Sequence, residues 1–244
     1  MKHCKCKITG EKIPVILSYG DMPIANDFSK KINKKNNYKM QIAFNENNGV
    51  FQLVSAPKPK KLFNKNYAFM SSTSKNMQKH FKQVADMIKK KFLKNKSNIM
   101  EIGCNDGIFL QNFRRFNHLG VEPSKNVCQI SKSKKLNVVN SFFNKQLIDK
   151  KKLVNKFDII FAANVICHIP DIITLFKNIE LTLKDKGIFI FEEPYLGDVI
   201  EKTSYDQIYD EHFYLFSVNS ISSIIKSLNL EVFNAERIST HGGS

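Results

Sequence analysis

The stretch Glu101-Ile102-Gly103-Cys104-Asn105-Asp106-Gly107 decides the fold, because it joins a β-type apolar run to a helical pattern. Gly103 and Gly107 let the backbone turn tightly and approach a ligand closely. The stretch matches the G-x-G-x-x-G dinucleotide loop only in part. A strand, a glycine-containing turn and a helix in this order predict the first βαβ unit of a parallel sheet.

The same alternation continues along the rest of the sequence. Apolar β-type runs predict strands at Asn98–Gly103, His118–Glu122, Val138–Phe143, Phe157–Val165, Gly187–Glu192 and Leu230–Ile238. Helical spacing predicts helices at about Ile108–Phe116, Lys125–Lys135, Ile172–Leu183 and Asn219–Leu228. This order is typical of a doubly wound, Rossmann-like α/β sheet, whose ligands bind at the carboxyl ends of the strands.

The segments before residue 98 have a different character. Residues 1–56 are punctuated by glycine and proline and predict a small irregular or β-rich lobe. Residues 57–97 contain a linker rich in proline and lysine, followed by helical spacing over 74–94. Residues 98–244 are the predicted α/β core.

Lysine makes the chain basic, and it does so unevenly. The 244 residues include 38 Lys and Arg against 22 Asp and Glu, a formal net charge of +16. Residues 1–97 contain 21 lysines, 5 acids and no arginine, whereas residues 98–244 are balanced in charge. A nucleic-acid-binding protein shows such asymmetry. Arginine, however, is the residue that best forms bidentate hydrogen bonds to phosphates and base edges, and residues 1–97 have none. We therefore interpret the lysines as a solvated surface and expect no nucleic-acid partner, although some could help to hold an anionic small substrate.

No segment predicts export or membrane insertion. Hydrophobic residues make up 42% of the chain, which is enough for a packed core. No apolar run approaches the roughly 20 residues that a membrane-spanning helix needs. The N-terminal residues are too polar for a secretory signal, and five cysteines, an odd number, argue against a disulfide framework. We expect a cytoplasmic protein without a membrane partner.

Acidic residues surround the predicted ligand-binding turn. Glu101 and Asp106 would repel a pyrophosphate, but they suit a cofactor with a cationic amino-acid end. Glu122 ends the next predicted strand, 19 residues after Gly103, where an acid can accept hydrogen bonds from both ribose hydroxyls. This combination favours S-adenosylmethionine over a nicotinamide cofactor. The alternative is an ordinary βαβ turn with surface acids.

Residues near the ends of the other strands complete the predicted cofactor site. Phe142 and Phe143 would lie against an adenine ring, or would be two core aromatics of a strand. Asn164 follows two alanines, which are small and leave room beside a cofactor. The full predicted set is Glu101, Gly103, Asn105, Asp106, Gly107, Glu122, Pro123, Phe142, Phe143 and Asn164.

Four segments together resemble one family. They are Glu101-Ile102-Gly103-Cys104-Asn105-Asp106-Gly107-Ile108, Gly120-Val121-Glu122-Pro123-Ser124, Ala163-Asn164-Val165-Ile166-Cys167-His168-Ile169, and Phe191-Glu192-Glu193-Pro194-Tyr195-Leu196-Gly197-Asp198 continuing to Tyr205-Asp206-Gln207-Ile208-Tyr209-Asp210-Glu211-His212-Phe213. The sequence resembles the S-adenosylmethionine-dependent sugar C-methyltransferases that act on nucleotide-linked 4-keto-deoxyhexoses. The likeness runs from about Met22 to the terminal His241-Gly242-Gly243-Ser244. It implies a class I methyltransferase fold and C-methylation through an enolate.

The resemblance also implies which residues act on the substrate. His212 is implied to be the base that removes the proton beside the 4-keto group, and Tyr209, Glu211, His168 and Tyr67 are implied to be active-site residues. The chemistry of these side chains agrees with the roles that the resemblance implies. A histidine abstracts protons near neutral pH, an adjacent acid can fix its tautomer or raise its basicity, and a tyrosine hydroxyl can stabilise an enolate oxygen. Taken singly, His168 could instead be a satisfied core residue and Tyr67 a packing aromatic.

The sequence departs from the family at its N-terminal lobe. That lobe usually holds a zinc ion between two Cys-x-x-Cys pairs, which satisfy the tetrahedral preference of zinc. Here His3-Cys4-Lys5-Cys6 replaces the first pair, and Asn45 and Asn48 stand where the second is expected. Asparagine is a poor zinc ligand, so we expect no tightly bound structural zinc and assign no metal-ligating residues.

A second departure concerns the C-terminal end. The family continues past His-Gly-Gly with another strand and a further α/β domain, whereas this sequence ends at Ser244. We therefore expect the strand Leu230–Ile238 to lack its family neighbour, in either a fragment or a natural truncation. Two other functions stay open. A methyltransferase for nucleic acid or protein would fit the basic N-terminal portion, and an inactive truncated binding module would fit the lost zinc ligands.

Overall fold

The chain folds into two compact units that are each assembled from separate stretches of sequence. The computed structural model describes residues 2–26, 37–65 and 67–244. One unit, here called the β-lobe unit, comprises Met1–Leu62, Asn164–Phe176 and Glu192–Ser244. The other, the sheet unit, comprises Phe63–Ala163 and Lys177–Phe191. Each unit has its own β-sheet.

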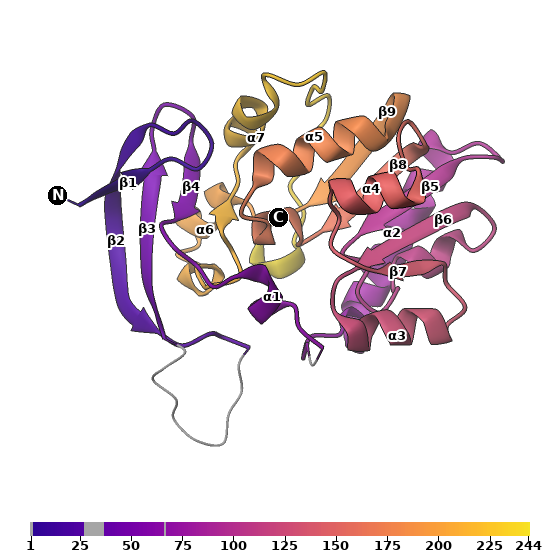
Figure 1. Ribbon diagram of the computed structural model, residues 1–244, viewed down its shortest axis with the longest axis horizontal. Helices are drawn as coiled ribbons and strands as arrows, with labels where there is room; N and C mark the ends of the chain where they lie inside the picture. Colours follow the sequence, from indigo (N-terminus) through magenta and orange to yellow (C-terminus); the bar gives the residue numbers. More distant parts are fainter. Residues whose placement is uncertain (1, 27–36, 66) are drawn as a thin grey trace. The chain divides into compact units, whose positions relative to one another are not determined.

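A five-stranded sheet forms the centre of the sheet unit (Figure 1). Its strands lie in the order β7-β6-β5-β8-β9, and β5 pairs in parallel with both β6 and β8, as β6 does with β7. The bounds are β5 Asn98–Ile102, β6 Asn117–Glu122, β7 Val138–Asn140, β8 Phe157–Ala163 and β9 Leu183–Glu192. The strand order reverses direction between β5 and β8, so the predicted doubly wound sheet is confirmed, and its switch point lies at the end of β5.

Helix α2 (Lys75–Phe92) supplies much of the core of the sheet unit. Its apolar face buries Phe81, Ala85 and Ile88 against residues of β5 and β8. The rings of Phe109 and Phe161 stack in this core, with their centroids 3.8 Å apart. The helix begins after Ser74, whose side chain accepts a hydrogen bond from the backbone N–H of Met77 at 3.3 Å. The helical spacing over 74–94 is therefore confirmed.

Three more helices follow strands of the parallel sheet. They are α3 (Lys125–Ser133), α4 (Lys145–Lys151) and α5 (Ile172–Thr182). The first and third confirm predicted helices, whereas α4 was not predicted. Asn144 starts α4 by accepting a hydrogen bond from the N–H of Leu147 at 2.9 Å, which is a typical helix N-cap.

Two predicted elements are shorter than expected. The predicted helix Ile108–Phe116 is a single 3₁₀ turn, η3 (Leu110–Phe113), because the side chain of Asn112 donates to the carbonyls of Ile108 and Phe109 and so competes with helical bonds. The predicted strand Val138–Phe143 ends at Asn140, whose side-chain amide donates to the carbonyls of Glu122 and Pro123 at 2.8 and 2.9 Å. Phe142 and Phe143 therefore lie in the loop that follows.

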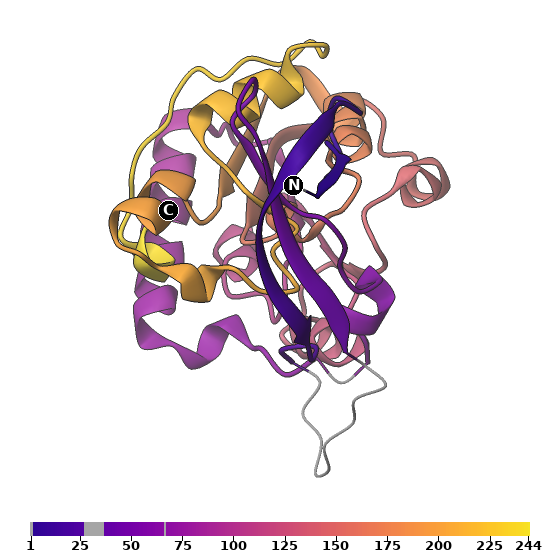
Figure 2. The same ribbon diagram turned by 90° about the vertical axis from the view of Figure 1, so that its left-hand side faces the viewer.

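An antiparallel sheet organises the β-lobe unit (Figure 2). Its order is β1-β2-β3-β4-β10, with bounds β1 His3–Lys5, β2 Lys12–Met22, β3 Tyr38–Asn45, β4 Val50–Leu53 and β10 Tyr214–Leu215. The predicted β-rich N-terminal lobe is thus present. Strand β10 comes from far along the chain and pairs with β4, an addition that the sequence did not predict.

Three helices belong to the same unit. They are α1 (Pro59–Leu62), α6 (Leu196–Glu201) and α7 (Val218–Ile225). Helix α7 confirms the predicted helix near Asn219–Leu228 and begins with a capping box between Ser217 and Ser220. Leu196 and Val199 of α6 pack with Leu215 of β10, which ties the C-terminal segments to the lobe.

The predicted strand Leu230–Ile238 is wrong. This segment is described in full and forms no strand, and residues 231–237 are all exposed. A strand without a partner leaves its backbone groups unpaired, and nothing apolar is buried here to offset that cost. The segment is instead fastened by Arg237, whose guanidinium donates to Asp198 and, at 2.7 Å, to Glu201 of α6.

The two asparagines of the predicted zinc-ligand positions make local hydrogen bonds. The Asn45 amide donates to the Glu11 carboxylate at 3.0 Å, and the Asn48 amide lies 3.9 Å from the sulfur of Cys6. Both side-chain oxygens accept backbone N–H groups two residues further on. These side chains stabilise the β3–β4 turn. That no structural zinc binds here stays a prediction.

Candidate active site

The loop after β5 has the conformation of a ligand-binding turn. Gly103, Asn105 and Gly107 have φ angles of 68°, 46° and 81°, so three of five consecutive residues are left-handed. Glycine adopts this conformation without strain, and asparagine tolerates it better than most residues. The N–H of Gly103 bonds to the carbonyl of Val121 on β6 at 2.8 Å, and this anchors the loop to the switch point of the sheet.

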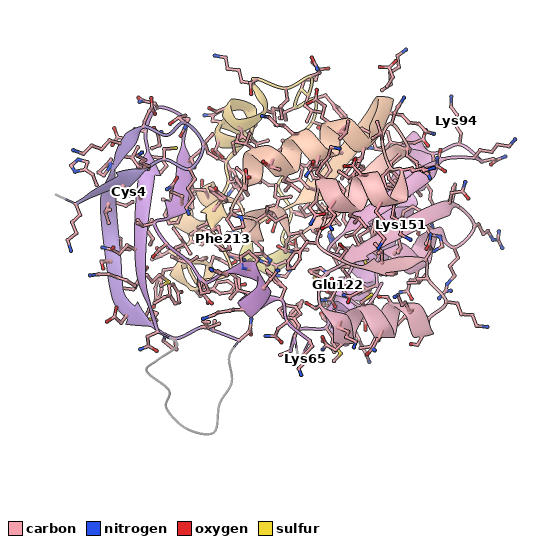
Figure 3. The ribbon with its side chains drawn as sticks, viewed as in Figure 1. Cys4, Lys65, Lys94, Glu122, Lys151 and Phe213 are labelled. Carbon is pink, nitrogen blue, oxygen red and sulfur yellow. The ribbon has the colours of Figure 1, made fainter. Side chains whose placement is uncertain are left out.

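Glu122 ends β6 and fastens this loop (Figure 3). One carboxylate oxygen accepts the N–H of Asn105 at 2.9 Å, and the other accepts the N–H of Ser124 at 2.7 Å. Burial raises the pKa of Glu122, and these hydrogen bonds partly oppose that rise. Each carboxylate oxygen has a second lone pair, so Glu122 keeps the capacity to accept two further hydrogen bonds, as a ribose diol would donate.

Two more buried acids carry acceptors that no described residue satisfies. The side chains of Glu101 and Asp106 are 4% and 1% exposed. The Oε2 atom of Glu101 and the Oδ1 atom of Asp106 accept no hydrogen bond from the part of the chain that the structure describes. Burial raises the pKa of Glu101 well above its usual value, and the nearby charges of Glu122 and Asp106 raise it further. Buried acceptors of this kind are rare and call for a donor or cation from a ligand.

The residues present therefore fit a cofactor with hydroxyl donors and a positive charge. The loop conformation, the two orphaned acceptors and the spare lone pairs of Glu122 match the ribose diol and the ammonium group of S-adenosylmethionine. The same three carboxylates would repel a pyrophosphate. The expected residues Glu101, Gly103, Asn105, Asp106, Gly107 and Glu122 lie together in the sheet unit, and Pro123 follows directly.

A turn before α2 supports the loop, and the sequence did not predict it. The backbone N–H groups of Ser71 and Ser72, in the 3₁₀ turn η2 (Ser71–Thr73), donate to the side chains of Asn105 and Asp106 at 3.1 and 3.2 Å. The available signal was the run Ser71-Ser72-Thr73 directly before a helix, which is typical of a segment that offers backbone donors. Tyr67, four residues earlier, packs its ring on Phe63 at 5.4 Å.

Three other predicted cofactor residues have distinct positions. Phe142 and Phe143 are half-buried after β7, so each keeps part of its ring exposed. Asn164 belongs to the β-lobe unit, where it has a left-handed φ of 52° and donates its N–H to the carbonyl of Glu192 at 2.8 Å. Whether these three contact a cofactor stays a prediction.

A histidine cluster lies inside the β-lobe unit. The rings of His168 and His212 stack with centroids 5.2 Å apart, and the ring of Tyr209 lies 4.4 Å from that of His212. His168 comes from the 3₁₀ turn η4 (Ile166–His168), and the other two precede β10. The N–H of Phe213 bonds to the carbonyl of Cys167 at 2.8 Å, which holds the two segments together.

The orientation of His212 is fixed by the backbone. Its Nδ1 lies 2.7 Å from the carbonyl oxygen of Gln207, and because a carbonyl only accepts, Nδ1 carries the hydrogen. The neutral ring therefore has its lone pair on Nε2. Burial lowers the pKa of His212 to about 4, so the imidazole is neutral at pH 7 and can accept a proton. A backbone carbonyl thus fixes the tautomer that we expected an adjacent acid to fix.

The neighbours of His212 are strongly perturbed as well. Burial lowers the pKa of His168 far below its usual value, and the charge of His212 adds to this. Burial, followed by the charge of Glu211, raises the pKa of Tyr209, which keeps its hydroxyl protonated. Glu211 itself accepts a hydrogen bond from the amide of Asn26 at 2.5 Å.

Sequence reasoning missed three residues around this cluster. Glu193 is buried, accepts the N–H groups of Val165 and Ile166 at 2.9 and 2.7 Å, and has its pKa raised by burial to about 7. The buried Cys167 thiol lies close enough to Glu193 to affect its pKa. His241, which lacked any supporting pattern, lies near enough for its charge to lower the pKa of His212. Only the fold brings these positions together.

Comparison with known proteins agrees with this geometry. Residues 75–235, more than half of the chain, match the family model described as "Methyltransferase domain". The chain belongs to this family. It is a class I S-adenosylmethionine-dependent methyltransferase domain, and the loop after β5, Glu122 and His212 all lie within the matched residues.

Individual relatives are distant. The chain is 24% identical over 182 residues to the C-methyltransferase NovU of Streptomyces niveus, an alignment that covers 73% of this chain and 43% of that protein. Among solved structures, a methyltransferase complex with the Trm112 activator of Haloferax volcanii matches with a TM-score of 0.55 and 16% identity, covering 69% of this chain and 76% of the other. The plantazolicin methyltransferase BpumL in complex with SAH matches with a TM-score of 0.54 and 14% identity, covering 70% and 73%. The two structures share the methyltransferase fold.

A membrane span is absent from the described residues. None of their helices combines the length and the apolar character that crossing a bilayer requires.

Proposed function

We propose that this protein transfers a methyl group from S-adenosylmethionine to a ring carbon of a nucleotide-linked 4-keto-deoxysugar. The observation that carries the proposal is the buried, neutral His212, whose Nδ1 is held by Gln207 so that Nε2 presents a proton-accepting lone pair. A base of this kind is what C-methylation beside a ketone needs, because the carbon must lose a proton before it becomes a nucleophile.

The cofactor is assigned to the sheet unit. Glu122 would accept the two ribose hydroxyls, and the orphaned oxygens of Glu101 and Asp106 would accept donors from the cationic amino-acid end. Phe142 and Phe143 would give the adenine an apolar face, and Asn164 is assigned to the same cofactor. When bound, the sulfonium supplies an electrophilic methyl group.

The substrate chemistry is assigned to the histidine cluster. His212 Nε2 removes the proton from the carbon next to the ketone, and the electron pair of that C–H bond moves into an enolate. The protonated hydroxyl of Tyr209 is suited to donate a hydrogen bond to the enolate oxygen, and His168 is suited to lie alongside it. The C=O bond would re-form as the enolate carbon bonds to the methyl carbon, while the bond from that methyl to the sulfonium sulfur would break and leave neutral S-adenosylhomocysteine.

The relatives support a C-methylation in general terms. NovU is named a C-methyltransferase, and the sequence segments that include His168 and His212 resemble those of the sugar C-methyltransferases. The chain spans less than half of the length of NovU, so the sugar substrate is proposed from the residues and the resemblance. Glu211 and Tyr67 are proposed as further active-site residues on the resemblance alone.

Proton exchange tests the base separately from methyl transfer. The purified protein is incubated in deuterium oxide with a nucleoside-diphosphate-linked 4-keto-6-deoxyhexose, with and without S-adenosylmethionine. We expect deuterium to enter the carbon beside the ketone without the cofactor, and a methyl group to appear there with it. His212→Asn should lose both by a factor of about 10² to 10⁴, the usual contribution of a general base, while calorimetry shows unchanged cofactor affinity.

A matched control separates base chemistry from surface effects. His3→Asn makes the same replacement at an exposed position of β1 and should keep full exchange and transfer. Exchange at the wild-type rate in His212→Asn would refute the base assignment. Cofactor binding without exchange on any ketosugar would refute the substrate class and leave the methyltransferase domain intact.

A further inference from the structure

Cys167, His168 and His212 form a compact set of metal-binding donors. Each offers one ligand atom, and these atoms all lie within 4.8 Å of one another. Cys167 and His212 are buried, and His168 is half-buried as a whole residue, although its Nε2 atom is buried. Among residues 2–26, 37–65 and 67–244, this is the one group of three such side chains.

The arrangement is held by the backbone as well as by side-chain packing. The N–H of Phe213 bonds to the carbonyl of Cys167 at 2.8 Å, so the segments that carry Cys167 and His212 are joined next to the donors. The two imidazole rings stack, with centroids 5.2 Å apart and an interplanar angle of 20°, so they hold each other in place. A mutual separation of at most 4.8 Å lets side-chain rotation bring the three donors onto one ion at the usual zinc distances of about 2.0 to 2.3 Å.

The types of ligand atom in this cluster favour zinc. Two imidazoles and a thiolate are ligands that zinc favours, and three protein ligands leave a fourth position for water or another molecule. His212 already has the arrangement of a metal-binding histidine, because its Nδ1–H bonds to the carbonyl of Gln207 at 2.7 Å and directs the Nε2 lone pair outward.

We propose that Cys167, His168 and His212 bind a zinc(II) ion, and that this ion inhibits the enzyme by occupying the lone pair of His212. The metal site stands on geometry alone, while its inhibitory effect rests on the proposed function of His212 as the base. Zinc forms a bond to the sulfur and displaces the thiol proton. The carboxylate of Glu193 lies near that thiol and has an oxygen, Oε2, that accepts no hydrogen bond from the described residues, so it is positioned to receive the proton. Removal of zinc by a chelator restores the base.

Binding is tested without reference to activity. The full-length protein is stripped of metal, and zinc affinity is measured by competition with a chromogenic chelator, with cobalt(II) as the spectroscopic probe. Wild-type protein should bind one cobalt ion here with the intense visible bands of a tetrahedral site and a thiolate charge-transfer band. Cys167→Ala should lose the charge-transfer band and weaken zinc binding more than tenfold, since even second-shell changes cost about 10- to 100-fold.

Two matched variants identify the site. Cys128→Ala removes another buried cysteine that is not part of the cluster and should keep wild-type binding. Cys4→Ser combined with Cys6→Ser tests the N-terminal lobe, the other place where thiols lie close in sequence. If the double variant loses the cobalt bands while Cys167→Ala keeps them, the metal belongs to the lobe and the proposal is wrong.

Inhibition of proton exchange by zinc is measured in the same variants. Zinc should abolish proton exchange by the wild-type protein reversibly, and in Cys167→Ala, measured against that variant's own zinc-free rate, inhibition should need more than tenfold higher zinc. Thermal unfolding confirms that the variant is folded, and Cys167→Ser serves if it is not. Zinc binding by a protein with no exchange activity would refute only the proposed function. Exchange that zinc leaves untouched, together with absent cobalt bands, would refute the metal site.

Discussion

Gly107→Ala should destabilise the protein through a clash that can be relieved at a second site. Gly107 has a φ of 81°, and a Cβ atom there would lie 2.4 Å from Cδ1 of Leu136 and 3.2 Å from the hydroxyl of Ser131. Leu136 is buried with Cys104, Leu110, Cys128 and Val138, so it has little room to retreat.

Two costs combine in this variant. A left-handed backbone costs a residue with a Cβ about 1–2 kcal/mol, and overpacking a filled core costs about 1–3 kcal/mol. We therefore expect Gly107→Ala to lower the free energy of unfolding by about 2–5 kcal/mol. The control is Gly10→Ala, at a glycine with a φ of 76° and nothing within 4 Å of its built Cβ. That variant should lose only the backbone cost, about 1–2 kcal/mol.

Urea unfolding followed by far-ultraviolet circular dichroism measures both variants. A Leu136→Val change removes the clashing Cδ1 atom, so in the Gly107→Ala background it should restore part of the lost stability, whereas alone it should destabilise. The coupling energy of the cycle should be about 1–3 kcal/mol, as for residues in direct contact. Equal losses for Gly107→Ala and Gly10→Ala, or additive effects of the two changes, would show that the loop yields and that the packing argument fails.

Three further predictions concern the acids and the C-terminal segment. Glu101→Gln should stabilise the protein at pH 7 but weaken cofactor binding. The pKa of Glu101 is higher in the folded protein than in the unfolded chain, so the free energy of unfolding of the wild type falls as pH rises above about 4.5. The variant should lack this part of the fall. Urea unfolding of both proteins from pH 4 to 8 measures the difference. Glu122→Gln should cost calorimetric affinity for S-adenosylmethionine about 10- to 100-fold, because a charged acceptor is lost; unchanged affinity would remove Glu122 from the site. Arg237→Ala should speed amide hydrogen exchange in residues 230–239 with little change in the unfolding midpoint, since the Arg237 side chain is exposed and the buried Asp198 keeps Lys202 as a second cation at 3.5 Å, and Arg237→Lys should be intermediate.

The parallel sheet could be predicted because its signals are local. Strands β5 and β8 are largely apolar, β6 places Leu119 and Val121 at alternate positions, and α2 and α3 show helical spacing. The failures have long-range or side-chain causes. The pairing of β10 with β4 joins residues more than 160 positions apart, and Leu230–Ile238 has strand-like residues but no partner that would make a strand. Asn112 stops a helix that periodicity alone would continue.

The candidate site also contains some residues that the sequence predicts and others that it does not. The loop after β5 and Glu122 could be predicted, since a glycine-containing turn and an acid about 20 residues later form one local pattern. The backbone donors of Ser71 and Ser72, and the group of Cys167 and Glu193 around the histidines, could not. Their roles depend on burial and on contacts between segments far apart in sequence, which a single sequence does not encode in any local pattern.

The sheet unit of this basic protein keeps two buried acids, Glu101 and Asp106, each with a side-chain oxygen that accepts no hydrogen bond from the described residues. Lysines outnumber acids fourfold in residues 1–97, yet in the part of the chain that the structure describes Asp106 pairs with a single cation, Lys134 at 3.9 Å, and the orphaned oxygens of Glu101 and Asp106 have no donor there. A cation packed against these carboxylates would stabilise the free protein, because an unpaired buried acid costs folding energy. It would also occupy the place of a positively charged ligand. The folding energy lost by leaving these carboxylates without a cation can therefore be recovered when a cationic cofactor binds. A lysine introduced beside Glu101 should raise the free energy of unfolding and lower the affinity for the cofactor.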